Sequence, residues 1–143
     1  MSNNNEIRAM VMNKKITIDS KIENISIIEK LIDDISADYS LSSEVYGNVL
    51  VSVIEVVSNA ILHGNKLDAK KKVNIDISIE SRVLEFTVQD EGPGFDFTNV
   101  PDPTLPENIE KPHGRGIFLM NNLADEVSFK NNGSTTILKF NLK

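Results

Sequence analysis

The sequence predicts an α/β (α+β) two-layer sandwich, in which helices cover one face of a mixed, mostly antiparallel sheet. Two long segments near the start of the chain carry apolar residues at helical spacing. Five short segments, one before the helices and the others after them, alternate between polar and apolar residues as strands do. The length of 143 residues allows one substantial core and leaves no room for a second folded domain.

The composition narrows the class of protein. It is 40% hydrophobic and 25% charged, as in soluble globular proteins, and no apolar run approaches the ~18 residues of a membrane span. The lack of cysteine excludes disulfides and thiol nucleophiles and suits a cytoplasmic protein. A net charge of -6 argues against binding to nucleic acid or to an anionic membrane. We therefore expect a protein or small-molecule partner.

The first elements of the domain follow a short tail. Residues 1–13 lack the basic-then-apolar pattern of a secretory signal, so we expect a flexible tail there and a single domain over residues 14–143. The first strand is predicted over residues 15–19, and Ser20 can cap a helix that ends near Asp38. One side of that helix carries isoleucines at helical spacing: Ile22, Ile25, Ile28, Ile32 and Ile35.

A second helix and a hairpin come next. Ser42 or Ser43 can cap this helix, and Gly64 with Asn65 forms a natural end for it. The segments 72–79 and 83–88 alternate around the turn E-S-R and are predicted to pair as a hairpin.

The segment from Asp90 to Pro112 is rich in proline and has no apolar periodicity, so we expect a long irregular loop. In a compact domain such a loop is usually functional. A short helix is predicted over residues 115–123. A last hairpin should pair residues 126–130 with 135–142 across N-N-G-S.

The second helix carries a polar stripe. At about 100° per residue, one sector about 80° wide collects Asn48, Ser52, Glu55, Asn59 and His63. Apolar residues flank the stripe on both sides, so we expect it to line a pocket. Taken alone, Glu55 and Asn59 could equally belong to a solvated helix face, and His63 could interact with the helix dipole.

Two glycine-rich loops follow. In D-E-G-P-G-F, residues 90–95, the glycines permit close approach of a ligand and Asp90 can accept a hydrogen bond from an amine. A simple turn would explain this loop equally well. In H-G-R-G-I-F-L-M, residues 113–120, free amides at a helix N-terminus together with Arg115 can bind phosphate, although helices also begin this way without a ligand.

In combination and in this order, these motifs resemble the GHKL superfamily of ATPases. The chain carries E-x-x-x-N, D-x-G-x-G-F, a proline-rich lid, G-x-G-I-F-L-M and G-S-T-T. Among the branches, it is most similar to the small anti-sigma factor serine/threonine kinases. The resemblance implies a Bergerat-type ATP-binding fold, with ATP and Mg²⁺ as cofactors.

The resemblance also implies roles for individual residues. Glu55 matches the general base, and Asn59 matches the magnesium ligand. Asp90 matches the acid that accepts from the adenine amino group, and Thr135 matches a hydroxyl near the adenine. Two glycine loops complete the site, Gly92 and Gly94 at the adenine end, and Gly114, Arg115 and Gly116 at the phosphates.

Two functions remain open at this point. The first is a kinase with anti-sigma activity, which phosphorylates an anti-sigma-factor antagonist protein and binds a sigma factor. The second is a noncatalytic ATP-dependent binding module. A complete histidine kinase needs a phospho-accepting histidine, whereas His63 and His113 lie inside ATP-site motifs. Family members commonly form homodimers. Lys111 of the lid is either a phosphate contact or an exposed lysine.

Overall fold

A computed structural model describes residues 11–94 and 123–142. The first half of the chain consists of β1 (Met12–Asp19), η1 (Ile22–Asn24), α2 (Ile25–Asp38), α3 (Ser43–Asn59) and η2 (Ala60–Gly64). The second half consists of β2 (Lys72–Glu80), β3 (Val83–Gln89), β4 (Glu126–Lys130), η5 (Asn131–Gly133) and β5 (Thr135–Asn141).

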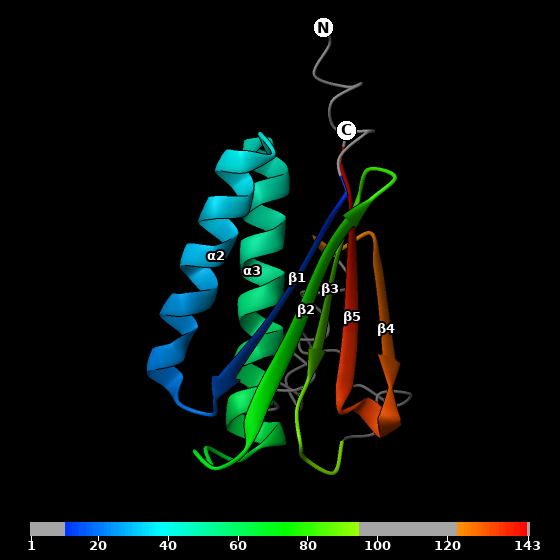
Figure 1. Cartoon of the computed structure of the whole chain (residues 1–143). Coiled ribbons are helices and arrows are strands. Elements are labelled where there is room, and N and C mark those ends of the chain that lie inside the picture. Colours follow the sequence, from blue (N-terminus) through cyan, green and yellow to red (C-terminus); the bar gives the residue numbers. More distant parts are fainter. Residues whose placement is uncertain (1–10, 95–122, 143) are drawn as a thin grey trace, which may run out of the picture.

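The strands form one sheet in the order β1-β2-β3-β5-β4. Every pair of neighbouring strands in this sheet is antiparallel. The described sheet is therefore fully antiparallel, whereas a mixed, mostly antiparallel sheet was expected. The helices α2 and α3 lie side by side over one face of the sheet (Figure 1). The predicted two-layer α+β sandwich is confirmed.

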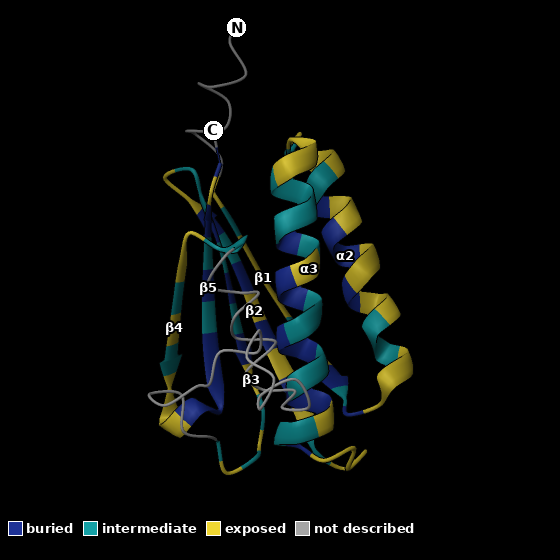
Figure 2. Cartoon of the chain, turned by 180° about the vertical axis from the view of Figure 1, so that it is seen from behind, coloured by how far each residue is buried: buried dark blue, intermediate teal, exposed yellow. Residues whose placement is uncertain are grey.

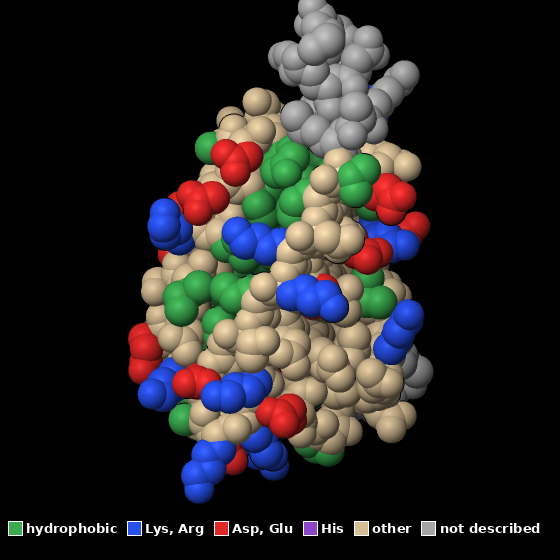
Figure 3. All heavy atoms as spheres, in the orientation of Figure 1, with side chains coloured by type: hydrophobic (Ala, Val, Ile, Leu, Met, Phe, Trp, Pro, Cys, Tyr) green, Lys and Arg blue, Asp and Glu red, His purple; other side chains and the backbone are tan. Residues whose placement is uncertain are grey.

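The core lies between the helices and the sheet. Alternate residues of β2 are fully buried, as the sequence pattern predicts, namely Val73, Ile75, Ile77 and Ile79. The buried sides of α2 and α3 face these strands, whereas their exposed sides point away from the sheet (Figure 2). Phe86 of β3 and Phe140 of β5 meet edge to face, with ring centroids 6.4 Å apart. The face seen in Figure 3 carries interspersed acidic and basic side chains.

The two helix starts differ from each other. Ser42 caps α3, because its side chain accepts the N–H of Val45 at 3.1 Å. The expected cap by Ser20 is wrong. Helical structure begins at Ile22 without a side-chain cap, and the Ser20 hydroxyl donates instead to the carbonyl of Lys71 at 2.7 Å. Ser20 therefore ties the end of β1 to the start of β2.

The second helix ends where expected, but in a wider turn. η2 is π-helical, and the N–H of Asn65 donates to the carbonyl of Ala60 at 2.8 Å. Together, α3 and η2 span 22 residues, enough by length and composition alone to cross a membrane. Several apolar side chains of this 22-residue segment lie in the core with no exposed surface, namely Val49, Val53, Val57 and Ile61. Packing in the core accounts for these side chains.

Both predicted hairpins are confirmed. β2 and β3 are joined by Ser81 and Arg82, whose φ angles of 51° and 65° are those of a tight two-residue turn. β4 and β5 pair across η5, where Asn132 has a φ of 59°. All but the last residue of the predicted helix over residues 115–123, and most of the proline-rich segment, lie outside the described residues.

Candidate functional site

The polar stripe of α3 lies on the flank of the buried face. Ser52 is completely buried, and its hydroxyl has no hydrogen-bond partner in the described part of the chain. Asn48, Glu55 and Asn59 are half-buried. No hydrogen bond joins the side chain of Glu55 or Asn59 to another described residue. A carboxylate and an amide thus lie one helical turn apart on this face of α3.

The π-helical turn changes the end of the stripe. The stripe was predicted with a constant helical period through His63, but the period widens from Ala60 onward. Asn59 is the last residue of regular α3, so the prediction holds up to Asn59, and the extra residue per turn rotates His63 relative to it.

Asp90 lies directly after β3, at the same end of the fold as η2. Its N–H donates to the carbonyl of Ser134 at 2.9 Å, and its Oδ1 accepts the N–H of Gly92 at 2.8 Å. Burial raises the pKa of the Asp90 carboxyl above its ordinary value, whereas the Gly92 N–H and the Lys71 ammonium act in the opposite direction. The half-buried carboxylate can accept a hydrogen bond from a ligand amine.

Two glycines let the Asp90 loop contact the end of the helix. A Cβ atom on Gly64 would lie 2.4 Å from Cγ of Asp90, and a Cβ atom on Gly92 would lie 2.1 Å from the Gly64 carbonyl oxygen. Real Cβ atoms essentially never approach so closely. The helix that carries Glu55 and Asn59 therefore ends against Asp90. Their convergence on one site stays a prediction.

Gly94 connects the same loop to η5. Its φ is 83°, a conformation that favours glycine, and a Cβ atom there would lie 2.0 Å from the carbonyl oxygen of Asn132. The start of β5 therefore borders the Asp90 loop.

Thr135 is the first residue of β5. It pairs with Gln89, and strand alternation places both side chains on the sheet face opposite the helices. Its hydroxyl accepts the side-chain N–H of Asn131 at 3.0 Å. Thr136 pairs with the buried Val88 on the helix-facing side. The adenine role of Thr135 stays a prediction.

The remaining predicted site residues cannot be placed. Gly114, Arg115, Gly116 and Lys111 all lie outside the described residues, and their roles stay predictions.

Asn65 is a site-adjacent residue that the sequence reasoning missed. It appeared only as part of a helix stop, yet it is almost completely buried and its side chain contacts the Asp90 loop. No sequence signal marks it as buried, because its neighbours on the C-terminal side are exposed.

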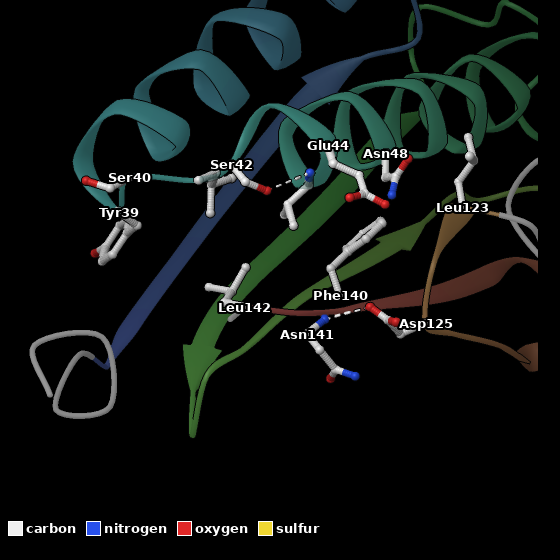
Figure 4. Close-up of a pocket in the computed structure, with 12 residues that line it drawn as sticks. Tyr39, Ser40, Ser42, Glu44, Asn48, Leu123, Asp125, Phe140, Asn141 and Leu142 are labelled. Carbon is white, nitrogen blue, oxygen red and sulfur yellow. Dashed lines mark hydrogen bonds between the residues drawn. The ribbon is translucent and has the colours of Figure 1, made fainter. Parts of the chain in front are cut away.

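A separate cavity of about 370 Å³ lies at the other end of α3. Figure 4 shows Glu44 and Asn48 of α3 facing Phe140 of β5 across it. Glu55, Asn59 and Asp90 do not line this cavity.

Comparison with known proteins shows the family. Residues 18–141 match the model of the histidine kinase-like ATPase domain. The chain belongs to this family. The match runs from the end of β1 to the end of β5 and thus includes the whole described site. The resemblance inferred from the motifs is confirmed at the level of the family.

This histidine kinase-like ATPase domain is similar in sequence to two kinds of named proteins. The anti-sigma F factor of Geobacillus stearothermophilus is 42% identical over 94 residues, which are 61% of this chain and 63% of the relative. The serine-protein kinase RsbW of Bacillus cereus is 25% identical over 130 residues, which are 87% of this chain and 81% of the relative. The chain thus spans less than two thirds of the anti-sigma F factor that it matches.

A solved structure shares the fold. It contains the RsbU and RsbW domains of a Mycobacterium tuberculosis protein, with a TM-score of 0.66 and 17% sequence identity. The alignment covers 92% of this chain and 32% of that chain. At this identity, the likeness concerns the fold alone.

Proposed function

We propose that this chain is a cytoplasmic anti-sigma factor and ATP-dependent serine/threonine protein kinase. Its substrate would be a small anti-sigma-factor antagonist protein, and a sigma factor would be its alternative partner. The observation that carries the proposal is the pair Glu55 and Asn59, half-buried and one turn apart on a helix that ends against Asp90. The names of the relatives, anti-sigma F factor and serine-protein kinase RsbW, support the same function.

In this proposal Glu55 is the general base. Its carboxylate accepts the proton of the acceptor serine or threonine hydroxyl. The hydroxyl oxygen forms a bond to the γ-phosphorus of ATP while the bond from that phosphorus to the bridging oxygen breaks. ADP leaves with the electron pair of that bond. Such a transfer needs mainly positioning and charge neutralisation, with a carboxylate oriented toward the attacking hydroxyl.

Asn59 fits the part of a magnesium ligand. Its amide has no hydrogen-bond partner within residues 11–94 and 123–142 that would compete for it. No cluster of three or more His, Cys, Asp or Glu side chains in those ranges could hold a metal, so the other ligands would be phosphate oxygens and water, as is common for Mg²⁺. When bound, Mg²⁺ neutralises charge on the phosphates.

The nucleotide would lie between Asp90 and the predicted phosphate loop. Asp90 would accept from the adenine amino group, with Gly92 and Gly94 letting the base approach the backbone. Gly114, Arg115 and Gly116 would bind the phosphates. A homodimer belongs to the same proposal, and the family resemblance is its motivation.

The test combines partner capture with phosphate transfer. The chain is isolated from its native cell with its bound proteins and is incubated with ATP labelled at the γ-phosphate. We expect label on a serine or threonine of a small copurifying protein. Glu55→Gln should lower this transfer by roughly 10²- to 10⁴-fold while ADP still binds. Asn59→Ala should weaken both transfer and magnesium-dependent ADP binding. Ser58→Ala, on the same helix but off the stripe, is the matched control.

Other outcomes assign a different function. Label on an aspartate of a response regulator would move the chain to the histidine-kinase branch. If ADP binds but no protein becomes labelled, the chain is a noncatalytic ATP-dependent binding module. Transfer at the wild-type rate by Glu55→Gln would remove Glu55 from the role of general base.

A further inference from the structure

Asn65 is a buried amide whose hydrogen-bonding groups are almost all in use. Only 1% of its surface is exposed. Its Nδ2 donates to the Ser20 hydroxyl at 2.8 Å and to the Lys72 carbonyl at 3.0 Å. Its Oδ1 accepts the backbone N–H of Glu91 at 2.7 Å. One side chain thus joins the end of α3, the β1–β2 pair and the Asp90 loop.

Ser20 is the second buried polar residue of this network. It is also 1% exposed, and its hydroxyl accepts from Asn65 while it donates to the Lys71 carbonyl. Leaving any of these groups without a partner would cost about 1–3 kcal/mol, because a buried polar group cannot return to water. The network is therefore a rigid support rather than a loose contact.

Hydrogen bonds hold the two backbone amides on either side of Asp90, and the Asn65 network supplies one of them. The N–H of Asp90 donates to Ser134, and the next N–H, that of Glu91, donates to Asn65. The Glu91 carboxylate also accepts the N–H of Lys72 at 2.5 Å. The backbone of Asp90 is thus held from two directions, by the start of β5 and by Asn65.

We propose that Asn65 is a positioning residue of the nucleotide site, which holds the Asp90 backbone so that this protein discriminates adenine from guanine nucleotides. The inference rests on the proposed function, in which the Asp90 carboxylate accepts from the adenine amine. Guanine presents a carbonyl at that position, so the carboxylate rejects it only when it is held in place. A loop released from Asn65 can turn the carboxylate away and lose this distinction.

The substitutions separate positioning from stability. Asn65→Leu has similar volume but lacks the acceptor for Glu91. Asn65→Asp keeps that acceptor and loses the donors to Ser20 and Lys72. Ser20→Ala is the matched control, because it removes two hydrogen bonds of the same buried network and leaves the bond between Asn65 and Glu91 in place. All three variants should be less stable than the wild type.

The measurement is the ratio of the GDP and ADP dissociation constants, by calorimetry with magnesium at a temperature where every variant is folded. We expect Asn65→Leu to lower this ratio by roughly 10-fold or more, the factor that one hydrogen bond to a charged group carries. Ser20→Ala and Asn65→Asp should change it by less than about 3-fold, because both keep the Glu91 bond and that factor corresponds to under 1 kcal/mol.

The outcomes distinguish this inference from the proposed function. If the wild type does not bind ADP, or binds ADP and GDP equally, the adenine site itself fails and the inference fails with it. If the wild type discriminates and Asn65→Leu discriminates equally well, only the inference is overturned. If Asn65→Leu does not fold, Asn65→Asp decides, because it retains the acceptor for the Glu91 N–H. Loss of discrimination between ADP and GDP in Asn65→Asp would then overturn the inference.

Discussion

Substitution of Gly64 by alanine tests the contact between Asp90 and η2, which continues α3. Gly64 has no positive φ, so its backbone accepts alanine and only space opposes the change. The new methyl would lie 2.4 Å from Cγ and Oδ2 of Asp90. The carboxylate must retreat by about 1 Å to reach the 3.4 Å at which ordinary contact begins. Such a displacement disturbs its bond to the Gly92 N–H, now 2.8 Å, because hydrogen bonds tolerate little change in distance and angle.

Two consequences can be measured. Overpacking of this kind lowers the free energy of unfolding by about 1–3 kcal/mol. In the proposed function, displacing the carboxylate from the adenine removes a hydrogen bond to a charged group, about 1.5–3 kcal/mol, so ADP affinity should fall roughly 10- to 150-fold. Urea denaturation and calorimetry report the two quantities separately.

Gly47 provides a matched control on the same helix. A Cβ atom there meets nothing within 4 Å, so Gly47→Ala should raise the free energy of unfolding by about 0.5–1 kcal/mol and leave ADP affinity unchanged. Wild-type stability and ADP affinity in Gly64→Ala would refute the reasoning, because Asp90 could not then lie against the end of α3.

Two further predictions concern Asp90 and the core. Burial raises the pKa of the Asp90 carboxyl, so ADP affinity should fall as the pH drops through that raised pKa. Calorimetry of Asp90→Asn should show an ADP affinity that does not change over the same pH range. A wild-type affinity without this fall would contradict the proposed role of Asp90 in binding adenine. The stability of the protein without nucleotide depends on pH in the opposite direction. The stability linked to the raised pKa is present at low pH and is lost as the pH rises through that pKa. Asp90→Asn should therefore unfold at a higher temperature than the wild type near neutral pH. Phe86→Ala removes a fully buried ring that packs against Phe140 and should lower the free energy of unfolding by about 3–5 kcal/mol in urea; a loss below 1 kcal/mol would show that this ring is not part of a tightly packed core.

The parts of the fold that could be predicted from sequence are those with a local cause. The alternation of β2 follows from its own residues, and Ser42 caps α3 through a bond to Val45, only three residues away. The Glu55 and Asn59 stripe needed only the helical period. In each case, the partners lie within one element or one turn.

The features that were missed have distant causes. Ser20 looked like a helix cap, but its hydroxyl finds the Lys71 carbonyl 51 residues away. Asn65 is buried because β1, β2 and the Asp90 loop converge on it, which no local pattern records.

The pairing of β1 with β2 also decides when the site is completed during folding. β2 and β3 are joined by a two-residue turn and can pair early. β1 reaches β2 across at least 53 residues, and such distant pairing is slow because a long loop must close first. Ser20 can meet Asn65 only after β1 has docked. A chain still waiting for that step would have its helices and central hairpin but no fixed loop for the base, so competence to bind nucleotide arrives late in folding.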